Sequence, residues 1–302
     1  MVKMVLQYVR RELSDPRRQH LYREAILIAV AGNVLLAATK GAVAWFSGSS
    51  AVLSDAANSL SDTLYSLMMA AGLYLAQRPA DESHPQGHSR IEPLVSLLIV
   101  AAMGAAGFTA MRESVLRFLS GAAPIVPGWP TAVLLGSVVV KVAMFLWVGR
   151  IGRLAHSPAI DASARDNLAD VLTSAAALLG VWASRLVHPL FDPVAGVAVS
   201  LWIFRTAWEI LYENLGYLTG RSAPPELANQ IVAAASAVPG VLGVHQVISD
   251  YVGPRLRVDL HVDVDGEVEL HQAHTIADQV QAKVEALPEV DLAFVHVEPA
   301  GL

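Results

Sequence analysis

The sequence predicts a membrane all-α domain, a bundle of six transmembrane helices, followed by a small α+β domain. Its 302 residues are 54% hydrophobic and only 16% charged, whereas soluble domains usually have about 25% charged residues. Six apolar stretches precede Arg221, and each is long enough to cross a hydrocarbon core of about 30 Å as a helix. From Arg221 onward the chain has four basic and twelve acidic residues and only short apolar runs. We therefore expect lipid around the first part of the chain and water around the second.

The six predicted spans are separated by residues that end or interrupt helices. The breaks are Ser47 to Ser50, Arg78-Pro79, Gly121 to Pro130 and His188 to Pro193. The spans themselves are 25–47, 50–77, 91–117, 129–149, 159–184 and 190–213. Together they define a transmembrane domain at residues 25–215.

Basic residues near the span ends predict which side of the membrane each loop faces. Residues 1–24 carry six basic residues, and the loops after the second and fourth spans carry two each. The opposite loops have almost none, and cytoplasmic loops are the ones enriched in Lys and Arg. An even number of spans puts both ends of the chain on the same side. We expect a multi-pass protein of a bacterial or archaeal inner membrane, with a cytoplasmic basic N-terminal segment at 1–24.

Residues 222–302 are predicted to form a cytoplasmic domain with the element order α-β-β-α-β. Helical patterns cover 224–238 and 270–287, and strand patterns cover 243–250, 256–264 and 292–297. In the middle strand Val258, Leu260 and Val262 alternate with polar residues, which is typical of a half-buried antiparallel strand. The acidic composition argues against nucleic acid as a partner, because phosphate binding needs clustered Lys and Arg.

Acidic side chains cost about 3 kcal/mol each in hydrocarbon, and the second and fifth spans each place acids well inside an apolar stretch. The second span carries Asp55, Asn58 and Asp62 on one helix face, and the fifth carries Asp166 and Asp170 one turn apart. Apart from Asp55, these side chains lie about 12 to 18 Å from the ends at which their spans start, near the middle of the bilayer. The chain has no cysteine, so any metal must be bound by His, Asp, Glu or amide groups. Oxygen atoms from these two helices can surround one divalent cation.

A structural interpretation of the same residues stays open. Asn58 and Asp62 can cap or kink helices, or the acids can pair with Lys40 and Lys141, which also lie within spans. These two lysines are interpreted as counter-ions or as side chains that extend toward the membrane surface, rather than as ligands.

Three segments combine acidic, amide and histidine residues in a distinctive order. They are the run Ser54 to Asp62, the loop His84-Pro85-Gln86-Gly87-His88 and the run Asp166 to Ser174. In these segments the chain resembles the cation diffusion facilitator family of divalent metal/proton antiporters, and the resemblance extends from about Glu24 to the acidic, metallochaperone-like tail. It implies a homodimer that exports a divalent transition metal in exchange for protons by alternating access, and no enzyme activity.

The resemblance also implies a transport site, whose positions here are Asn58, Asp62, Asp166 and Asp170. Zinc-selective members of the family commonly have a histidine in this set, whereas this chain offers one amide and three carboxylates. Oxygen ligands suit Mn²⁺, and manganese-type members are the more similar ones. We therefore favour Mn²⁺ as the substrate, with Zn²⁺ and Fe²⁺ as the alternatives, and a divalent metal as a regulator as well.

Histidines outside the spans match two further metal sites of the family. Asp81, His84 and His88 match a site in the loop after the second span, although a polar loop with a glycine turn explains them equally well. In the tail, five residues match positions that bind a regulatory metal pair at the dimer interface: His245, His261, His274, His296 and Glu298. His271 and His274, which are three residues apart, are also consistent with solvent-exposed positions on a helix.

One position departs from the family pattern. Arg90 matches a basic residue that in some relatives pairs with an acid just after the sixth span, but here Gly220 stands at the acid's place. Dimerisation would then depend more on the tail and on apolar span contacts.

Two other functions compete with transport. An intramembrane aspartic protease would also pair two acids, but Gly-x-Gly-Asp and His-Glu-x-x-His are both absent from the sequence. A metal sensor or channel without proton coupling is the other possibility. Only an antiporter would use a proton gradient to move metal against the gradient of the metal itself.

Overall fold

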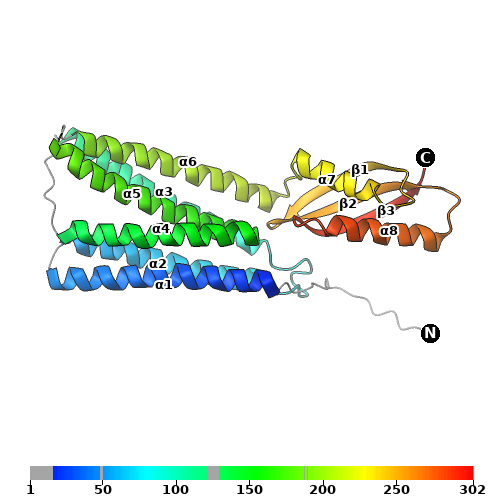
Figure 1. Ribbon diagram of the computed structural model, residues 1–302, viewed down its shortest axis with the longest axis horizontal. Coiled ribbons are helices and arrows are strands. Elements are labelled where there is room, and N and C mark those ends of the chain that lie inside the picture. Colours follow the sequence, from blue (N-terminus) through cyan, green and yellow to red (C-terminus); the bar gives the residue numbers. More distant parts are fainter. Residues whose placement is uncertain (1–15, 48–49, 121–128, 187, 189, 302) are drawn as a thin grey trace. The chain divides into compact units, whose positions relative to one another are not determined.

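The computed structural model describes residues 16–47, 50–120, 129–186, 188 and 190–301 (Figure 1). Most of the predicted N-terminal segment lies outside these residues, and so do the side chains of Asp55 and Asn58. The chain divides into two compact units, Met1–Asn214 and Leu215–Leu302, which are described one after the other.

The first unit contains six long helices within the described residues. They are α1 (Pro16–Ser47), α2 (Ser50–Ala76), α3 (Ile91–Leu119), α4 (Trp129–Ala155), α5 (Pro158–Leu186) and α6 (Phe191–Thr219), the last of which continues into the second unit. Their order confirms the predicted helical bundle. The helix α1 starts nine residues before the predicted span, because Pro16 suits a first helical turn whereas hydropathy marks only the part of a helix that lies in lipid.

Four of these helices are long and apolar enough to cross a membrane by length and composition alone. The candidate spans are Pro16–Val43, Ile91–Leu119, Leu135–Ala155 and Pro193–Thr219. Within the described residues α2 and α5 do not meet this measure, and they are the helices that carry Asp62, Asp166 and Asp170. The bundle also exposes large apolar side chains, among them Leu27, Phe108, Val139 and Trp147. Such a surface is suited to lipid and not to water.

Small residues allow α4 and α5 to approach closely. A Cβ atom on Gly149 would lie 3.4 Å from the Cβ of Ala164, and one on Gly152 would lie 3.1 Å from the backbone nitrogen of Asp161. Helices in membranes commonly pack through such small residues. This contact fixes α4, which carries Lys141, against α5, which carries Asp166 and Asp170.

A buried polar network joins α1, α3 and the start of α5. Glu92 accepts hydrogen bonds from the hydroxyl of Tyr22, at 2.6 Å, and from the hydroxyl of Ser157. The Arg18 guanidinium lies 3.8 Å from the same carboxylate and donates to the Tyr22 hydroxyl. Because each of its oxygens has a donor, this buried acid is compatible with the interior, and it connects three helices at one end of the bundle.

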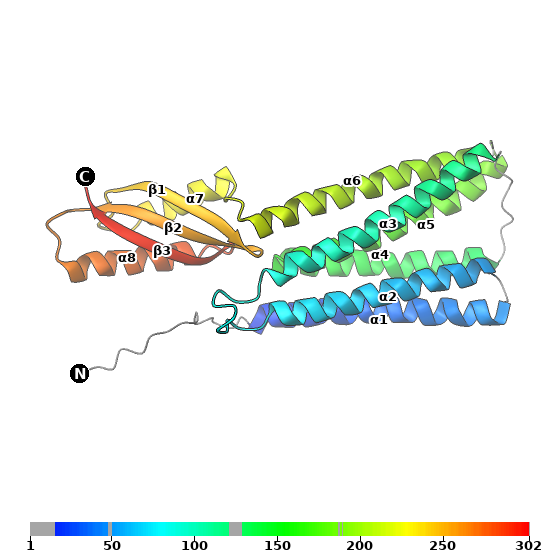
Figure 2. The ribbon, with the colours of Figure 1, turned by 180° about the vertical axis from the view of Figure 1, so that it is seen from behind.

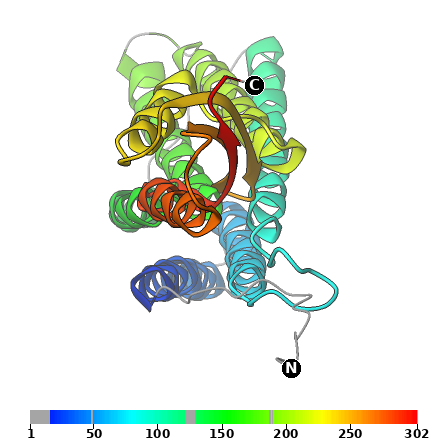
Figure 3. The ribbon, with the colours of Figure 1, turned by 90° about the vertical axis from the view of Figure 1, so that its right-hand side faces the viewer.

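The second unit is a three-stranded sheet with two helices. Its elements are α7 (Pro225–Ser236), β1 (Gly243–Val252), β2 (Arg255–Val264), α8 (Leu270–Glu285) and β3 (Val290–Pro299), in the predicted α-β-β-α-β order. The central strand β2 pairs antiparallel with β1, as predicted, and parallel with β3. Figures 2 and 3 show the strands side by side.

One face of this sheet is buried and the other is open. Val258, Leu260 and Val262 of β2 pack with Ile231 of α7 and Val280 of α8 in one apolar core, which confirms the predicted alternation. The polar residues between the valines lie on the open face. That face carries the histidines described below.

Glycine at position 220 suits the end of α6. Gly220 follows the helix with a φ of +70°, a left-handed conformation that side chains other than glycine adopt only with strain. The amide of Arg221 then closes the helix on the carbonyl of Gly216. The termination of the helix therefore favours glycine at this position.

Candidate metal-binding sites

The acids of α2 and α5 converge on a lysine of α4. The Lys141 Nζ donates a hydrogen bond of 2.9 Å to Asp62 Oδ2 and lies 2.6 Å from Asp170 Oδ2. Its side chain is only 6% exposed. Two carboxylates from different helices therefore hold one positive charge between them inside the bundle.

Asp166 belongs to the same cluster. It interacts electrostatically with Asp170, Lys141 and Asp62, and with Asp62 it lines a small cavity of about 10 Å³. Lys40 of α1 also interacts electrostatically with Asp62. Three of the four predicted transport residues thus lie together, while the side chain of the fourth, Asn58, is outside the described part of the chain. Clustered carboxylate oxygens can hold hard divalent cations or protons.

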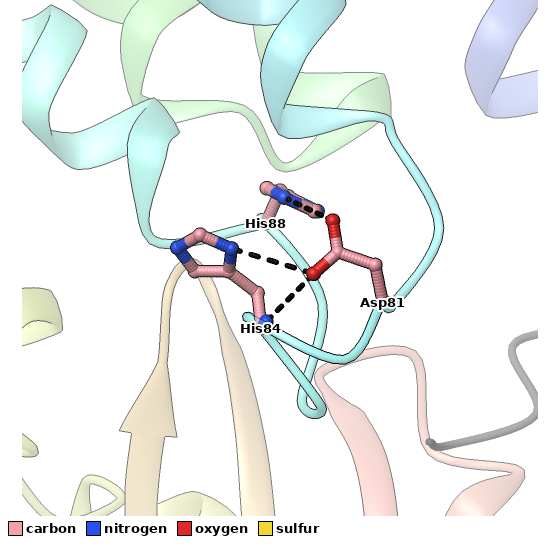
Figure 4. Close-up of side chains that lie close together, drawn as sticks. All are labelled: Asp81, His84 and His88. Atoms are coloured by element: carbon pink, nitrogen blue, oxygen red, sulfur yellow. Dashed lines mark hydrogen bonds and ion pairs between the residues drawn. The ribbon is translucent and has the colours of Figure 1, made fainter. Parts of the chain in front are cut away.

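The loop between α2 and α3 brings Asp81, His84 and His88 together (Figure 4). Asp81 Oδ1 accepts hydrogen bonds from the amide of Ser83, the amide of His84 and the hydroxyl of Ser83, at 2.6 to 2.9 Å. Asp81 Oδ2 lies 3.4 Å from His88 Nε2, and the two imidazole rings are 4.5 Å apart. One oxygen of Asp81 thus shapes the loop, and the other faces an imidazole.

Hydrogen bonding fixes the charge of this aspartate. The Ser83 hydroxyl is the largest influence, and with the neighbouring amide groups it lowers the pKa of Asp81 to about 2. Asp81 is therefore ionised at every physiological pH. The three side chains present one oxygen and two nitrogens within 4.8 Å of one another, a set that suits a borderline transition metal.

A β-bulge places a histidine on the open face of the sheet. Val244 pairs with Val262 and Gln246 pairs with His261, so His245 is an extra residue in β1. Bulges redirect side chains in this way. The His245 ring lies 5.5 Å from the ring of His261 on β2.

Glu298 on β3 joins these histidines. His261 Nδ1 lies 2.8 Å from Glu298 Oε1, and His245 Nε2 lies 3.6 Å from Glu298 Oε2. The hydrogen bond from His261 is the main reason why the pKa of Glu298 is lowered, and His245 and His296 act in the same direction. His245, His261 and Glu298 can supply three ligands to one ion.

The other two predicted tail residues differ in position. His296 pairs with His261 across β2 and β3, and its Nε2 lies 3.3 Å from Glu298 Oε1. His274 lies instead on α8, is 75% exposed and contacts Asp278 at 3.6 Å. Within a single chain His274 is therefore not brought to the cluster.

Sequence reasoning missed three features of these sites. It did not single out Asn33 of α1, whose side-chain amide lines the cavity beside Asp62, although a polar residue within an apolar span was a usable signal. It also did not predict that Lys141 contacts two acids at once. The bulge at His245 leaves no mark in the alternation of residues, so no sequence signal was available for it.

Two family models together match most of the chain. A family model described as "Cation efflux transmembrane domain" matches residues 26–219, and one described as "Cation efflux protein, cytoplasmic domain" matches residues 223–300. An uncharacterized transporter of Methanocaldococcus jannaschii is 33% identical over 90% of this chain and 96% of its own length. The chain belongs to the cation diffusion facilitator family of cation efflux transporters.

Further members of the cation diffusion facilitator family are similar over most of the chain. The manganese efflux system protein MneS of Bacillus subtilis is 26% identical over 90% of this chain and 94% of its own length. The magnetosome protein MamM of Paramagnetospirillum magneticum is 29% identical over 85% of this chain and 81% of its own. A solved C-terminal domain of MamM is 37% identical and covers 24% of this chain and 95% of that domain, with a TM-score of 0.24. This chain is accordingly an integral membrane protein that transports cations outward.

Proposed function

We propose that the chain exports Mn²⁺ in exchange for protons, with Asn58, Asp62, Asp166 and Asp170 as the transport site. The observation that carries this proposal is the convergence of Asp62 and Asp170 on the single ammonium group of Lys141. Carboxylates that hold an ammonium group inside a bundle are already arranged to hold another cation in its place.

Competition for the same oxygens accounts for the exchange. A carboxylate binds either a metal ion or a proton, so metal binding on one side releases protons, and protonation on the other side releases metal. Alternating access of one site is then sufficient for antiport. In the absence of metal, Lys141 neutralises part of the negative charge and keeps the acids from repelling one another.

The donor set favours manganese. The described acids offer oxygen ligands, which suit Mn²⁺, and the lack of imidazole removes part of the advantage of Zn²⁺. The similarity to a manganese efflux protein of Bacillus subtilis supports the same choice. Export of Zn²⁺ or Fe²⁺ by the same mechanism is the second candidate.

The test is metal transport by the purified protein in liposomes. With an outward-directed proton gradient, meaning an acidic lumen, we expect Mn²⁺ uptake into the lumen against the Mn²⁺ gradient, together with loss of luminal protons reported by a pH-sensitive dye. Zn²⁺ and Fe²⁺ are compared at equal concentration. Metal flux that only ever runs down the metal gradient, whatever the pH difference, would establish a channel and overturn the antiport proposal.

We also propose that the tail domain is cytoplasmic, forms the homodimer and senses metal. The open face of the sheet supplies His245, His261 and Glu298, and the loop site at Asp81, His84 and His88 would bind a further ion. A regulatory metal at the tail would report the cytoplasmic metal concentration to the transporter.

Metal binding to the tail should depend on pH through the imidazoles and not through Glu298. The pKa of Glu298 is lowered below the ordinary glutamate value of about 4.3. Glu298 is therefore fully charged above that value, and its charge is lost only at a still lower pH. Imidazole must be neutral to bind metal, so acidification from about pH 7.5 to about pH 5.5 should release the ion.

Calorimetric titration of the full chain with Zn²⁺, at about pH 7.5 and at about pH 5.5, checks this expectation. The Asp62→Asn background removes binding at the transport site, and His261→Ala should then weaken the tail site about tenfold or more. His274→Ala is the matched control, since His274 is exposed and lies outside the cluster, and it should leave the affinity unchanged. Equal losses in the two variants would contradict a site built from His261.

A further inference from the structure

Two buried asparagines beside the transport acids have amide orientations that hydrogen bonding fixes. Asn33 of α1 is 6% exposed, and its Nδ2 donates a hydrogen bond of 2.6 Å to Ser66 Oγ. The Ser66 hydroxyl donates its own hydrogen to the backbone carbonyl of Asp62, at 2.9 Å. With its hydrogen on the Asp62 carbonyl, Ser66 Oγ accepts from Asn33, so the amide nitrogen lies on that side and Oδ1 on the other.

Asn167 of α5 also has a fixed amide orientation. It is 2% exposed, and its Nδ2 donates a hydrogen bond of 2.8 Å to the backbone carbonyl of Ser163. A carbonyl oxygen only accepts, so the orientation of this amide is also fixed. In the described structure the Oδ1 atoms of Asn33 and Asn167 are both buried and have no hydrogen-bond partner. Buried acceptors without a donor are uncommon in folded proteins.

Both asparagines line the small cavity that Asp62 and Asp166 also line. Its volume of about 10 Å³ is close to that of one water-sized body. Residues with amide and carboxylate groups from α1, α2 and α5 thus line a space of about the size of one dehydrated ion, together with Tyr65, Ser66, Met69, Ile99, Ala102 and Ser163. The neighbouring Lys141 occupies Asp62 Oδ2 and Asp170 Oδ2 and is not among the residues that line this space.

We propose that Asn33 and Asn167 are ligands of the exported cation, binding it through their Oδ1 atoms in a position between α1, α2 and α5. This inference rests on the proposed transport function and extends its ligand set to a third helix. Neutral amide oxygens add coordination without adding negative charge, so they favour a hard divalent cation and do not bind protons in competition with it. They therefore contribute to metal affinity but not to proton coupling.

The test is Mn²⁺ binding to the purified full chain in detergent, measured by calorimetry, together with Mn²⁺ transport in liposomes. Asn33→Leu and Asn167→Leu keep the side-chain volume and remove the oxygen, and each should weaken Mn²⁺ binding about tenfold and raise the KM for transport. Asn33→Asp and Asn167→Asp retain an oxygen and should bind Mn²⁺ at least as tightly as the unmodified chain. The number of protons released per metal ion should be the same in the leucine variants as in the unmodified chain.

Asn214 provides a matched control. It is equally buried, its Nδ2 donates to the backbone carbonyl of Ile210, and its Oδ1 also has no partner in the described structure, but it does not line the cavity. Asn214→Leu should leave Mn²⁺ affinity unchanged. If Asn33→Leu and Asn167→Leu bind Mn²⁺ normally while Asp62→Asn does not, a buried water occupies the cavity and this inference is wrong, whereas the proposed transport site stands. If Asp62→Asn also binds and transports normally, the proposed function itself fails.

Discussion

Asp62→Asn is expected to reduce proton-driven Mn²⁺ transport at least a hundredfold. The substitution keeps the shape of the side chain and one oxygen, but it removes one of the negative charges that attract the ion. A unit charge acting on a neighbouring charge about 4 Å away contributes about 4 kcal/mol at an effective dielectric constant of 20, and a divalent ion experiences more. The same substitution removes a group that can carry a proton, so proton flux should fall with metal flux. Initial rates of Mn²⁺ uptake in liposomes measure both effects.

The control for this experiment is Asp161→Asn. Asp161 lies on α5 near the transport acids but pairs with Arg165 at 2.8 Å, one turn away on the same helix. Its substitution removes a negative charge of the same kind without changing the cluster, and transport should stay within about twofold of the unmodified rate. Comparable losses in Asp161→Asn and Asp62→Asn would mean that charge on α5 and α2 matters only for folding, and would refute the assignment of the site.

Lys141→Met is expected to tighten Mn²⁺ binding at least tenfold and to slow transport. The ammonium group contacts Asp62 Oδ2 and Asp170 Oδ2, so it competes with an incoming ion for these carboxylates, and its removal leaves two acids without their counter-ion. Methionine keeps most of the length of the side chain without the charge. Tighter binding follows because the competitor is gone, and slower turnover follows because an ion held more strongly is released more slowly. Calorimetry measures the affinity, and liposome assays at saturating Mn²⁺ measure the turnover.

Two further variants separate this role from simple support of the fold. Lys141→Arg keeps the positive charge and should keep the affinity close to that of the unmodified chain. Lys283→Met removes a positive charge from the tail domain, where the Lys283 Nζ donates to the carbonyl of Ala237, and should change neither quantity. Weaker Mn²⁺ binding in Lys141→Met would show that the lysine holds the acids in place for the metal and does not compete with it.

The candidate sites differ in how far the sequence could predict them. Asp62, Asp166 and Asp170 were predictable because acids are costly within apolar spans and because helix geometry sets their depth. Asp81, His84 and His88 were predictable because they are close together in the sequence and share one loop. The tail cluster was only partly predictable, since His245 reaches it through a bulge whereas His274 faces away on α8.

The sequence by itself determined the elements of this protein and the positions of its acids along them. Hydropathy and periodicity depend only on neighbouring residues, and these determine where helices and strands form and which residues lie within lipid. The tertiary structure decided which cation stands between the acids, because Lys141 is 79 residues from Asp62 along the chain and meets it only when α4 packs against α1 and α5. It also decided which amide oxygens remain without a donor at Asn33 and Asn167. Such contacts depend on how side chains from separate helices fit together, and no local pattern encodes that fit.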